Sequence, residues 1–223
     1  MKKAGGRKFK LVVFDLDGTV IDGTASIWKT FHAFLGLLEH PRRLELRRKF
    51  FAGKISYRQW AFDDLDLIKE HGADQSKMMK AMEGLSLMKG ARETLAALKA
   101  KGCVLGIISG SMDIVLEKLL PDYKKIFRYV YIPHLAFDAQ GRIKGIELGH
   151  DFSDKSKALM EICIREGIDL EQCVFVGDNY NDIQAARIAG LSIAFNSGSE
   201  KLNAVADVVI KKKDLGLILK YVK

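Results

Sequence analysis

Short runs of apolar residues alternate along the chain with segments in which apolar residues recur every three to four positions. The runs are typical of buried strands, and the segments are typical of amphipathic helices. The pattern predicts strands at 10–15, 103–108, 127–132, 173–177 and 191–195, and helices at 90–101, 112–120, 155–167, 180–189 and 213–222. This alternation predicts an α/β fold with a Rossmann-like parallel sheet flanked by helices. Residues 134–148 depart from this alternation of strands and helices. An Asp-Ala-Gln-Gly turn between two extended pieces predicts a hairpin there.

Residues 20–87 break the rhythm and contain no convincing buried strand. Their apolar side chains recur at helical spacing, as at Ile27, Phe31 and Phe34. We therefore expect a small α-helical cap domain at 20–87, inserted into an α/β core domain formed by 1–19 and 88–223. Open parallel sheets bind ligands at the carboxyl ends of their strands, and an insertion after the first strand would cover that edge.

Composition places the chain among globular proteins, with 48% hydrophobic and 29% charged residues in a length of 223. No apolar run approaches the ~20 residues of a membrane span, and the charged start lacks the hydrophobic stretch of a secretory signal. Cys103, Cys163 and Cys173 have no paired spacing, which favours free buried thiols over a disulfide or zinc site. We therefore expect a cytoplasmic protein with no membrane partner.

The net charge of +8 raises the question of nucleic-acid binding. The basic clusters are Lys2-Lys3, Arg7-Lys8, Arg42-Arg43, Arg47-Arg48-Lys49 and Lys211-Lys212-Lys213, and none is interleaved with aromatic residues as in a base-stacking groove. We interpret them as solvated surface and do not expect nucleic-acid binding. Attraction of an anionic phosphorylated substrate remains compatible with them.

Two aspartates, Asp15 and Asp17, follow the first predicted strand and precede Gly18. If the strand persists through residue 17, both carboxylates leave its end on the same face. Gly18 then permits a sharp turn. Two carboxylates at a strand end form an oxygen site that suits Mg²⁺ and a phosphate bridged by the metal. A simple acidic turn, or part of a calcium loop, is the alternative that these residues alone leave open.

Three downstream pieces favour the phosphate site. The second predicted strand ends in Ser109 and Gly110, which offer a hydroxyl and backbone amides to phosphate oxygens. Lys155 lies in the first turn of a predicted helix, where a lone lysine is normally solvated. The fourth predicted strand ends before Asp178, and Asp182 follows about one helical turn later.

Taken in order, these pieces resemble the four motifs of the haloacid-dehalogenase-like superfamily of phosphotransferases. The motifs are Asp15-Leu-Asp17-Gly-Thr-Val, Ser109-Gly110, Lys155, and Gly177-Asp178-Asn-Tyr-Asn181-Asp182. The match runs from residue 10 to about 195. Within the superfamily the chain is most similar to the phosphoserine-phosphatase-like branch, through Gly53-Lys-Ile-Ser-Tyr57, Ile193-Ala-Phe-Asn196 and the segment 213–222.

The resemblance implies a Mg²⁺-dependent phosphatase that hydrolyses a small phosphate monoester through an aspartyl-phosphate intermediate. Asp15 would be the nucleophile, Asp17 would protonate the leaving oxygen and then activate water, and Lys155 would stabilise the phosphorylated aspartate. The implied substrate contacts are Thr19, Ser109, Gly110 and Asn181, and the implied metal ligands are Asp15, Asp17 through its carbonyl, Asp178 and Asp182.

Charge explains why a metal is expected to be obligatory. The four aspartates and Lys155 sum to three negative charges when ionised, which would repel a phosphate dianion. Opposite charges ~4 Å apart attract by several kcal/mol near a protein surface, so Mg²⁺ would offset this repulsion.

Asp17 narrows the reaction class. Dehalogenases of the superfamily lack an acid at this position and ion-pumping ATPases carry a lysine there, which leaves phosphatases and phosphomutases. A phosphotransferase or phosphomutase on the same intermediate remains one alternative. A non-catalytic binding protein with the same fold is another, although the intact motif residues speak against it.

The predicted cap differs from that of phosphoserine phosphatases at two substrate-binding positions. By spacing, the glutamate with which phosphoserine phosphatases bind the substrate ammonium falls near Thr24, and the arginine that binds the substrate carboxylate falls near Asp64. An acid does not bind a carboxylate, so the sequence speaks against phosphoserine as the substrate, unless a shifted cap helix restores these contacts. Trp28 and Trp60 are candidate substrate contacts. The other cap aromatics, Phe31, Phe50 and Phe51, are expected mostly in the core of a helix bundle.

Overall fold

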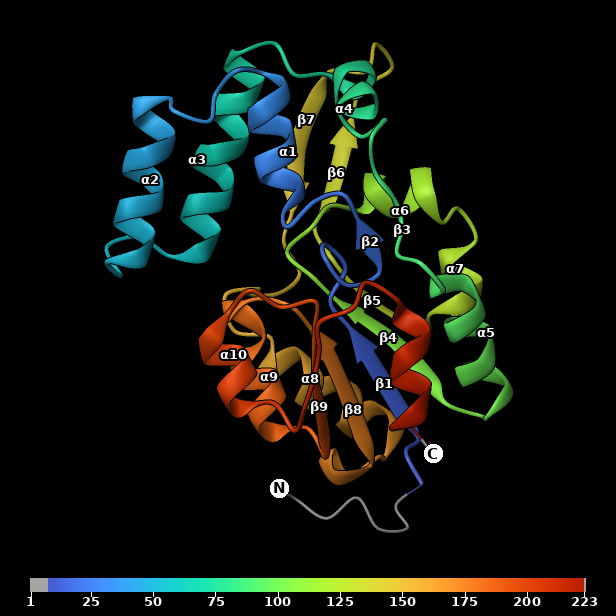
Figure 1. Cartoon of the computed structure of the whole chain (residues 1–223). Helices are drawn as coiled ribbons and strands as arrows, with labels where there is room; N and C mark the ends of the chain where they lie inside the picture. The colour runs from blue at the N-terminus through green and yellow to red at the C-terminus, as the bar shows by residue number, and fades with distance from the viewer. Residues whose placement is uncertain (1–7, 223) are drawn as a thin grey trace.

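A parallel six-stranded sheet forms the lower half of the molecule in Figure 1. The computed structural model describes residues 8–222. The strand order is β10 (Val208–Ile210), β9 (Leu191–Phe195), β8 (Cys173–Gly177), β1 (Leu11–Phe14), β4 (Val104–Ile108) and β5 (Tyr129–Tyr131), with every neighbouring pair parallel. The five predicted strands and the α/β fold class are therefore confirmed. The edge strand β10 was not predicted, because its short apolar run lies next to a run of lysines.

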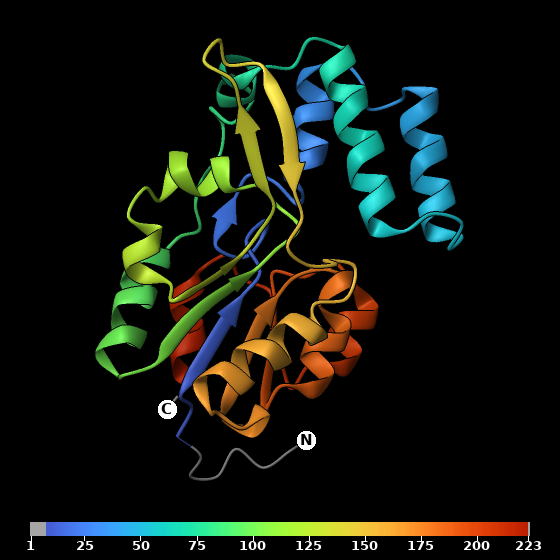
Figure 2. The same cartoon turned by 180° about the vertical axis from the view of Figure 1, so that it is seen from behind.

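Helices cover both faces of the sheet. They are α5 (Ala91–Ala100), α6 (Asp113–Leu119), α7 (Tyr123–Ile126), α8 (Ser156–Glu166), α9 (Ile183–Ile188) and α10 (Glu200–Val205), with 3-10 turns η1 (Leu170–Gln172), η2 (Tyr180–Asp182) and η3 (Leu215–Lys220). Side chains alternate along β1, so that Leu11 and Val13 pack with α8 and α9, while Val12 and Phe14 pack with α5 and η3. Figure 2 shows α8 lying across one face.

The register of the central strands brings three chain turns together. Phe14, the last residue of β1, pairs with Ile107 of β4 and with Val176 of β8. The segments that follow these strands therefore leave the sheet side by side at its carboxyl edge. These segments carry most of the residues predicted to act in catalysis, metal binding and phosphate binding.

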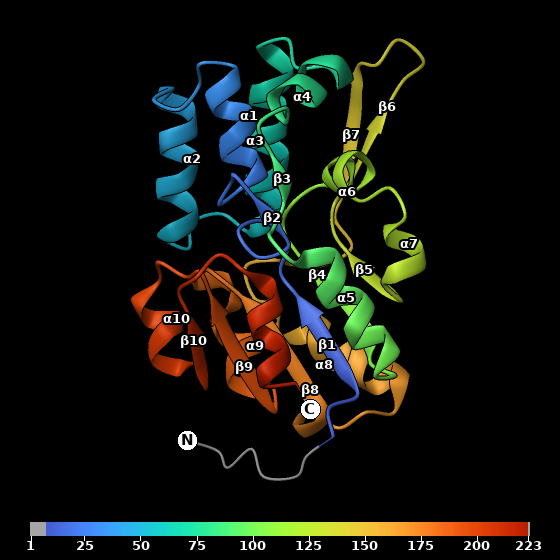
Figure 3. The ribbon, with the colours of Figure 1, turned by 45° about the vertical axis from the view of Figure 1, so that its right-hand side comes forward.

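Four helices form a second layer above this edge (Figure 3). They are α1 (Ile27–Phe34), α2 (Pro41–Phe51), α3 (Tyr57–Glu70) and α4 (Gln75–Ala81), joined to the sheet layer by the short strands β2 (Ile21–Asp22) and β3 (Ser86–Leu87). The expected helical cap is thus present. Phe31 is buried in its core as expected, whereas Phe51 is 54% exposed, which corrects the expectation for that ring.

The predicted hairpin is also present, as β6 (His134–Phe137) and β7 (Ile143–Glu147). Its chain comes from the sheet layer, yet it rises beside the cap helices (Figure 1). The Gln75 amide donates to the carbonyl of Gly141 at 2.8 Å, and β7 packs on α3. The division into a cap at 20–87 and a core at 1–19 and 88–223 stays a prediction.

Three of the predicted elements differ in detail, and α7 and α10 were not predicted. The strand β1 ends at Phe14 rather than persisting through residue 17, because the chain turns around the carbonyl of Leu16. The predicted helix 180–189 begins as the 3-10 turn η2 before α9. The predicted helix 213–222 is the 3-10 helix η3, whose Gly216 is a weak α-helix former and donates to Asp214 Oδ1.

The three cysteines are free and buried, as predicted. Within residues 8–222 no helix is both long and apolar enough to cross a membrane. The basic residues Lys2, Lys3 and Arg7 lie outside the described residues.

A close backbone approach near β9 provides a test of this packing. A Cβ atom on Gly190 would lie 2.1 Å from the carbonyl oxygen of Glu171. We expect Gly190→Ala to lower the free energy of unfolding by about 1–3 kcal/mol, because backbone must move to admit the methyl group. Urea denaturation measures this change. Gly149→Ala is the matched control, since nothing lies within 4 Å of its Cβ position. Equal midpoints for the two variants would contradict the packing described.

Candidate active site

A buried lysine connects two of the motif aspartates. The Nζ atom of Lys155 lies 2.6 Å from Asp15 Oδ1 and 2.6 Å from Asp182 Oδ1. Lys155 and Asp182 are fully buried and Asp15 is 5% exposed. Lys155 precedes α8, Asp15 follows β1 and Asp182 ends η2, so the contact fastens three segments. The sequence could not distinguish this lysine from a solvated one.

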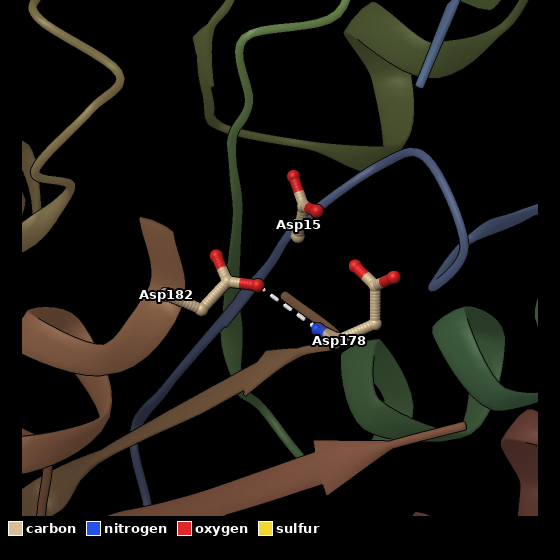
Figure 4. Close-up of side chains that lie close together, drawn as sticks. All are labelled: Asp15, Asp178 and Asp182. Carbon is tan, nitrogen blue, oxygen red and sulfur yellow. Dashed lines mark hydrogen bonds between the residues drawn. The ribbon is translucent and has the colours of Figure 1, made fainter. Parts of the chain in front are cut away.

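Asp178 completes a cluster of three carboxylates (Figure 4). Asp15, Asp178 and Asp182 each offer an oxygen within 4.8 Å of the others. Asp178 Oδ1 is buried and has no hydrogen-bond partner among the described residues. A set of carboxylate oxygens with one unsatisfied buried atom fits a hard divalent cation such as Mg²⁺. The backbone closes tightly here, since a Cβ on Gly18 would lie 2.5 Å from Asp178 Oδ2.

Asp182 has little spare hydrogen-bonding capacity. Its Oδ2 accepts hydrogen bonds from the backbone amides of Asp178 at 2.9 Å and Asn179 at 3.0 Å. Its Oδ1 accepts a hydrogen bond from Lys155 Nζ. The amide contact to Asp178 is the dashed line of Figure 4. These bonds fix the turn that presents Asp178. A side chain on Gly177 is excluded, because its Cβ would lie 2.4 Å from Asp182 Oδ2.

Asp17 is held by two donors from different layers. Its Oδ1 accepts from the Ser111 hydroxyl at 2.8 Å, and its Oδ2 accepts from the amide of Ile27, the first residue of α1, at 2.7 Å. The carboxylate is 6% exposed and stands apart from the three-carboxylate cluster. Burial, and then the charge of Asp15, raise the pKa of Asp17 to about 7, against the lowering effect of both hydrogen bonds.

The other buried groups show the same crowding of charge. Burial, then Asp15 and Asp182, raise the pKa of Asp178 well above its ordinary value. Burial raises the pKa of Asp182 to about 6, although Lys155 opposes this. Burial lowers the pKa of Lys155, but attraction to Asp15 and Asp182 outweighs it, so the net pKa is raised. The lysine therefore stays charged, while the carboxylates lack a sufficient counter-charge.

A cavity of about 560 Å³ opens above these residues between the two layers. Of the predicted site residues, Asp15, Asp17, Ser109, Gly110 and Asn181 line it. Thr19, Lys155 and Asp182 are fully buried and Asp178 is 9% exposed, and all four lie outside this lining. Asp178 lines a second cavity together with Gly18 and Thr24.

The predicted phosphate contacts have few internal partners. The Thr19 hydroxyl has none among residues 8–222. The Ser109 hydroxyl accepts from the Ser111 amide at 3.3 Å, and the Asn181 side chain donates to the Phe152 carbonyl at 3.2 Å. The hydrogen bond from the Ser111 hydroxyl to Asp17 could not be predicted without the fold.

The cap lining contains residues that the sequence did not identify as functional. Arg43, Arg47 and Phe51 lie one turn apart on α2, and all three line the cavity. Their four-residue spacing was the signal for a shared face, but it lies within a basic run that was interpreted as solvated surface. Trp28 and Trp60, the two candidate contacts, also line the cavity.

The two cap positions that depart from the resemblance lie differently. Thr24 is outside the main cavity, and its hydroxyl contacts that of Thr30 at 2.8 Å. Asp64 lines the cavity but is 4% exposed, and it pairs with His32 Nε2 at 3.0 Å. Neither residue is placed as a free group for the ammonium or the carboxylate of a substrate.

Two further contacts join the cap to the sheet layer at the cavity, besides the bond from Ile27 to Asp17. Trp28 Nε1 donates to the carbonyl of Gly110 at 3.0 Å. At the end of α2, the ring of Phe51 lies 5.4 Å from that of Tyr180, in the turn between Asp178 and Asp182. The cap therefore touches both motif loops that flank Asp15.

Comparisons with known proteins agree with this geometry. The family model for haloacid dehalogenase-like hydrolases matches residues 9–190. The chain is 32% identical to phosphoserine phosphatase from Methanocaldococcus jannaschii over 97% of this chain and 99% of the relative. A substrate-bound phosphoserine phosphatase structure is 30% identical with a TM-score of 0.75, covering 97% of this chain and 100% of that one. A phospho-aspartyl intermediate analogue of phosphoserine phosphatase is 31% identical with a TM-score of 0.75, at the same coverage.

The chain belongs to the haloacid dehalogenase-like hydrolases. Within that family it lies in the phosphoserine-phosphatase-like branch, and the family resemblance of its motifs is thereby confirmed.

The carboxylate cluster predicts a dependence of stability on pH and metal. Because the pKa of Asp178 is higher in the folded protein than in the unfolded chain, the folded protein keeps more protons. Its free energy of unfolding therefore falls as pH rises. In EDTA we expect the Tm of the wild type to fall between about pH 5 and 8, and that of Asp178→Asn to fall less. Added Mg²⁺ should raise the Tm of the wild type and have a smaller effect on the variant.

Thermal melts across pH, with and without Mg²⁺, measure both effects. Asp66→Asn is the control, since this carboxyl is exposed on α3 and its ion-pair partner within residues 8–222 is Lys69. Parallel pH curves for Asp178→Asn and the wild type would show that another group titrates.

Proposed function

We propose that this chain is a Mg²⁺-dependent phosphatase that hydrolyses a small phosphate monoester through an aspartyl-phosphate on Asp15. The observation that carries the proposal is the position of Asp15. It lines the cavity, contacts a fully buried lysine at 2.6 Å and lies in a cluster with Asp178 and Asp182. The chain is a hydrolase of phosphoric monoesters, the activity named for its relatives.

The reaction begins at the carboxylate of Asp15. One of its oxygens attacks phosphorus, the new phosphorus–oxygen bond forms, and the bond to the ester oxygen breaks. Asp17 gives its proton to that leaving oxygen. In the second half, Asp17 takes a proton from water and the water oxygen attacks phosphorus. The bond between phosphorus and the Asp15 oxygen then breaks, which releases inorganic phosphate and regenerates the Asp15 carboxylate. Dividing one displacement in two lowers the barrier of each step.

The surroundings of Asp17 support the double role proposed for it. It lines the cavity beside Asp15, and the Ser111 hydroxyl and the Ile27 amide fix the positions of both its oxygens. Orientation of a proton donor within reach of the leaving oxygen is the first requirement for general acid catalysis. Ser109, Gly110 and Asn181 are proposed to bind the phosphoryl oxygens, because they line the same cavity.

The proposed Mg²⁺ ligands are the carboxylates of Asp15 and Asp178, with the Asp17 carbonyl and Asp182 as further ligands. The lack of a partner for Asp178 Oδ1 among residues 8–222 supports this assignment. When bound, it would neutralise part of the charge shared by the carboxylates and the phosphate. Lys155 contributes a fixed positive charge at the attacking carboxylate, and Asp182 positions that lysine.

Loss of the nucleophile tests the proposal. We expect phosphate release from a panel of monoesters to require Mg²⁺, to stop in EDTA, and to fall at least about a thousandfold in Asp15→Asn. Acid-quenched wild-type enzyme should carry a phosphate that hydroxylamine releases, and the variant should carry none. Asp169→Asn, an exposed carboxyl before η1, is the control. Full activity in metal-free enzyme would contradict the proposal.

The same assay separates hydrolysis from phosphotransfer. Adding a small alcohol offers the phosphoenzyme a second acceptor. A phosphatase releases mainly inorganic phosphate, whereas a phosphotransferase or phosphomutase yields mainly the new ester.

A further inference from the structure

The cap side of the cavity has a distinct composition. Three cap helices each turn one face toward it, with Trp28, Lys29 and His32 from α1, Arg43, Arg47 and Phe51 from α2, and Tyr57, Trp60 and Asp64 from α3. The residues of α3 follow helical spacing, so they share one face. The cap lining is therefore aromatic and basic.

The basic residues of this lining are available to a ligand. Among the described residues, neither Lys29 nor Arg47 has a carboxylate within ion-pair distance. Arg47 lies over the ring of Phe51 at 5.4 Å, which orients its guanidinium without neutralising it. The Arg43 guanidinium donates to the carbonyl of Leu38 at 2.5 Å and retains its charge.

The acidic side chain of the cap lining already has a partner. Asp64 is the acid of the cap lining, and its bond to His32 fixes both side chains. His32 Nδ1 is buried without a hydrogen-bond partner among residues 8–222. Among the described residues, the cap side of the cavity lining thus has no free carboxylate for an ammonium group, while it has unpaired cations for an anion.

The size and walls of the cavity point to a leaving group larger than a serine. A volume of about 560 Å³ lies within the range that accommodates drug-sized molecules, roughly 300–1,000 Å³. The ring of Trp60 is held by Phe50, stacked at 4.3 Å, so it forms a rigid wall. Rigid aromatic walls favour planar or apolar surfaces.

We propose that the cap selects a phosphate ester whose leaving group joins an aromatic or broad apolar body to a negative charge. The aromatic rings of the cap contact the body, and Arg47 with Arg43 and Lys29 binds the charge. The phosphate itself lies at Asp15. This inference rests on the proposed phosphatase function and specifies the substrate class of the same site.

Three esters test it: phenyl phosphate, para-carboxyphenyl phosphate and O-phosphoserine. We expect kcat/KM to be lowest for phosphoserine and highest for the carboxylated aryl ester. In Arg47→Gln the ratio of kcat/KM between the carboxylated and plain aryl esters should fall about tenfold, mainly through KM, as expected for loss of a charged hydrogen bond. Phe51→Ala should lower kcat/KM for both aryl esters relative to phosphoserine.

Arg48→Gln is the matched control, because this arginine is the next residue on α2, exposed and outside the cavity lining. Its ratio should equal that of the wild type. A preference for phosphoserine over both aryl esters, or an unchanged ratio in Arg47→Gln, would overturn the inference and leave the phosphatase function intact. Absence of phosphate release from every ester would overturn both.

Discussion

The buried ammonium of Lys155 is the interaction on which the rest of the site depends. A charge removed from water is tolerated only where opposite charges and hydrogen bonds replace the solvent, and here Asp15 and Asp182 do so at 2.6 Å each. The lysine thereby ties Asp15, the proposed nucleophile after β1, to the turn after β8. Asp182 also accepts a hydrogen bond from the backbone amide of Asp178. The contact between Lys155 and Asp182 therefore helps to fix the position of Asp178 as well.

Most of this arrangement could be predicted from the sequence, because strands determine it. The apolar runs placed β1, β4 and β8, and parallel pairing then brings the residues after them to one edge. The family resemblance supplied the roles proposed for Asp15 and Lys155. The bond from Ser111 to Asp17 was out of reach, since it joins segments 94 positions apart through side-chain orientation alone.

The cap was predictable as a helical insertion but not as a binding surface. Which face of α2 meets the cavity depends on how α1, α2 and α3 pack, and spacing alone leaves that rotation open. Arg47 was therefore interpreted as solvated surface and Phe51 as core, and both line the cavity. Similarly, nothing in residues 134–148 indicates that the hairpin would lie against helices encoded some 70 residues earlier, although Gln75 and Gly141 are hydrogen-bonded.

That hairpin changes the mechanics of the molecule. Without the hairpin, the two linkers around β2 and β3 would be the chain connections between the cap and the sheet layer. Here the chain returns to the cap layer through β6 and β7, and the turn of the hairpin is bonded to the start of α4. The hairpin is therefore an additional connection between the two layers. Separation of the two layers would therefore also have to break the Gln75–Gly141 hydrogen bond and the packing of β7 on α3.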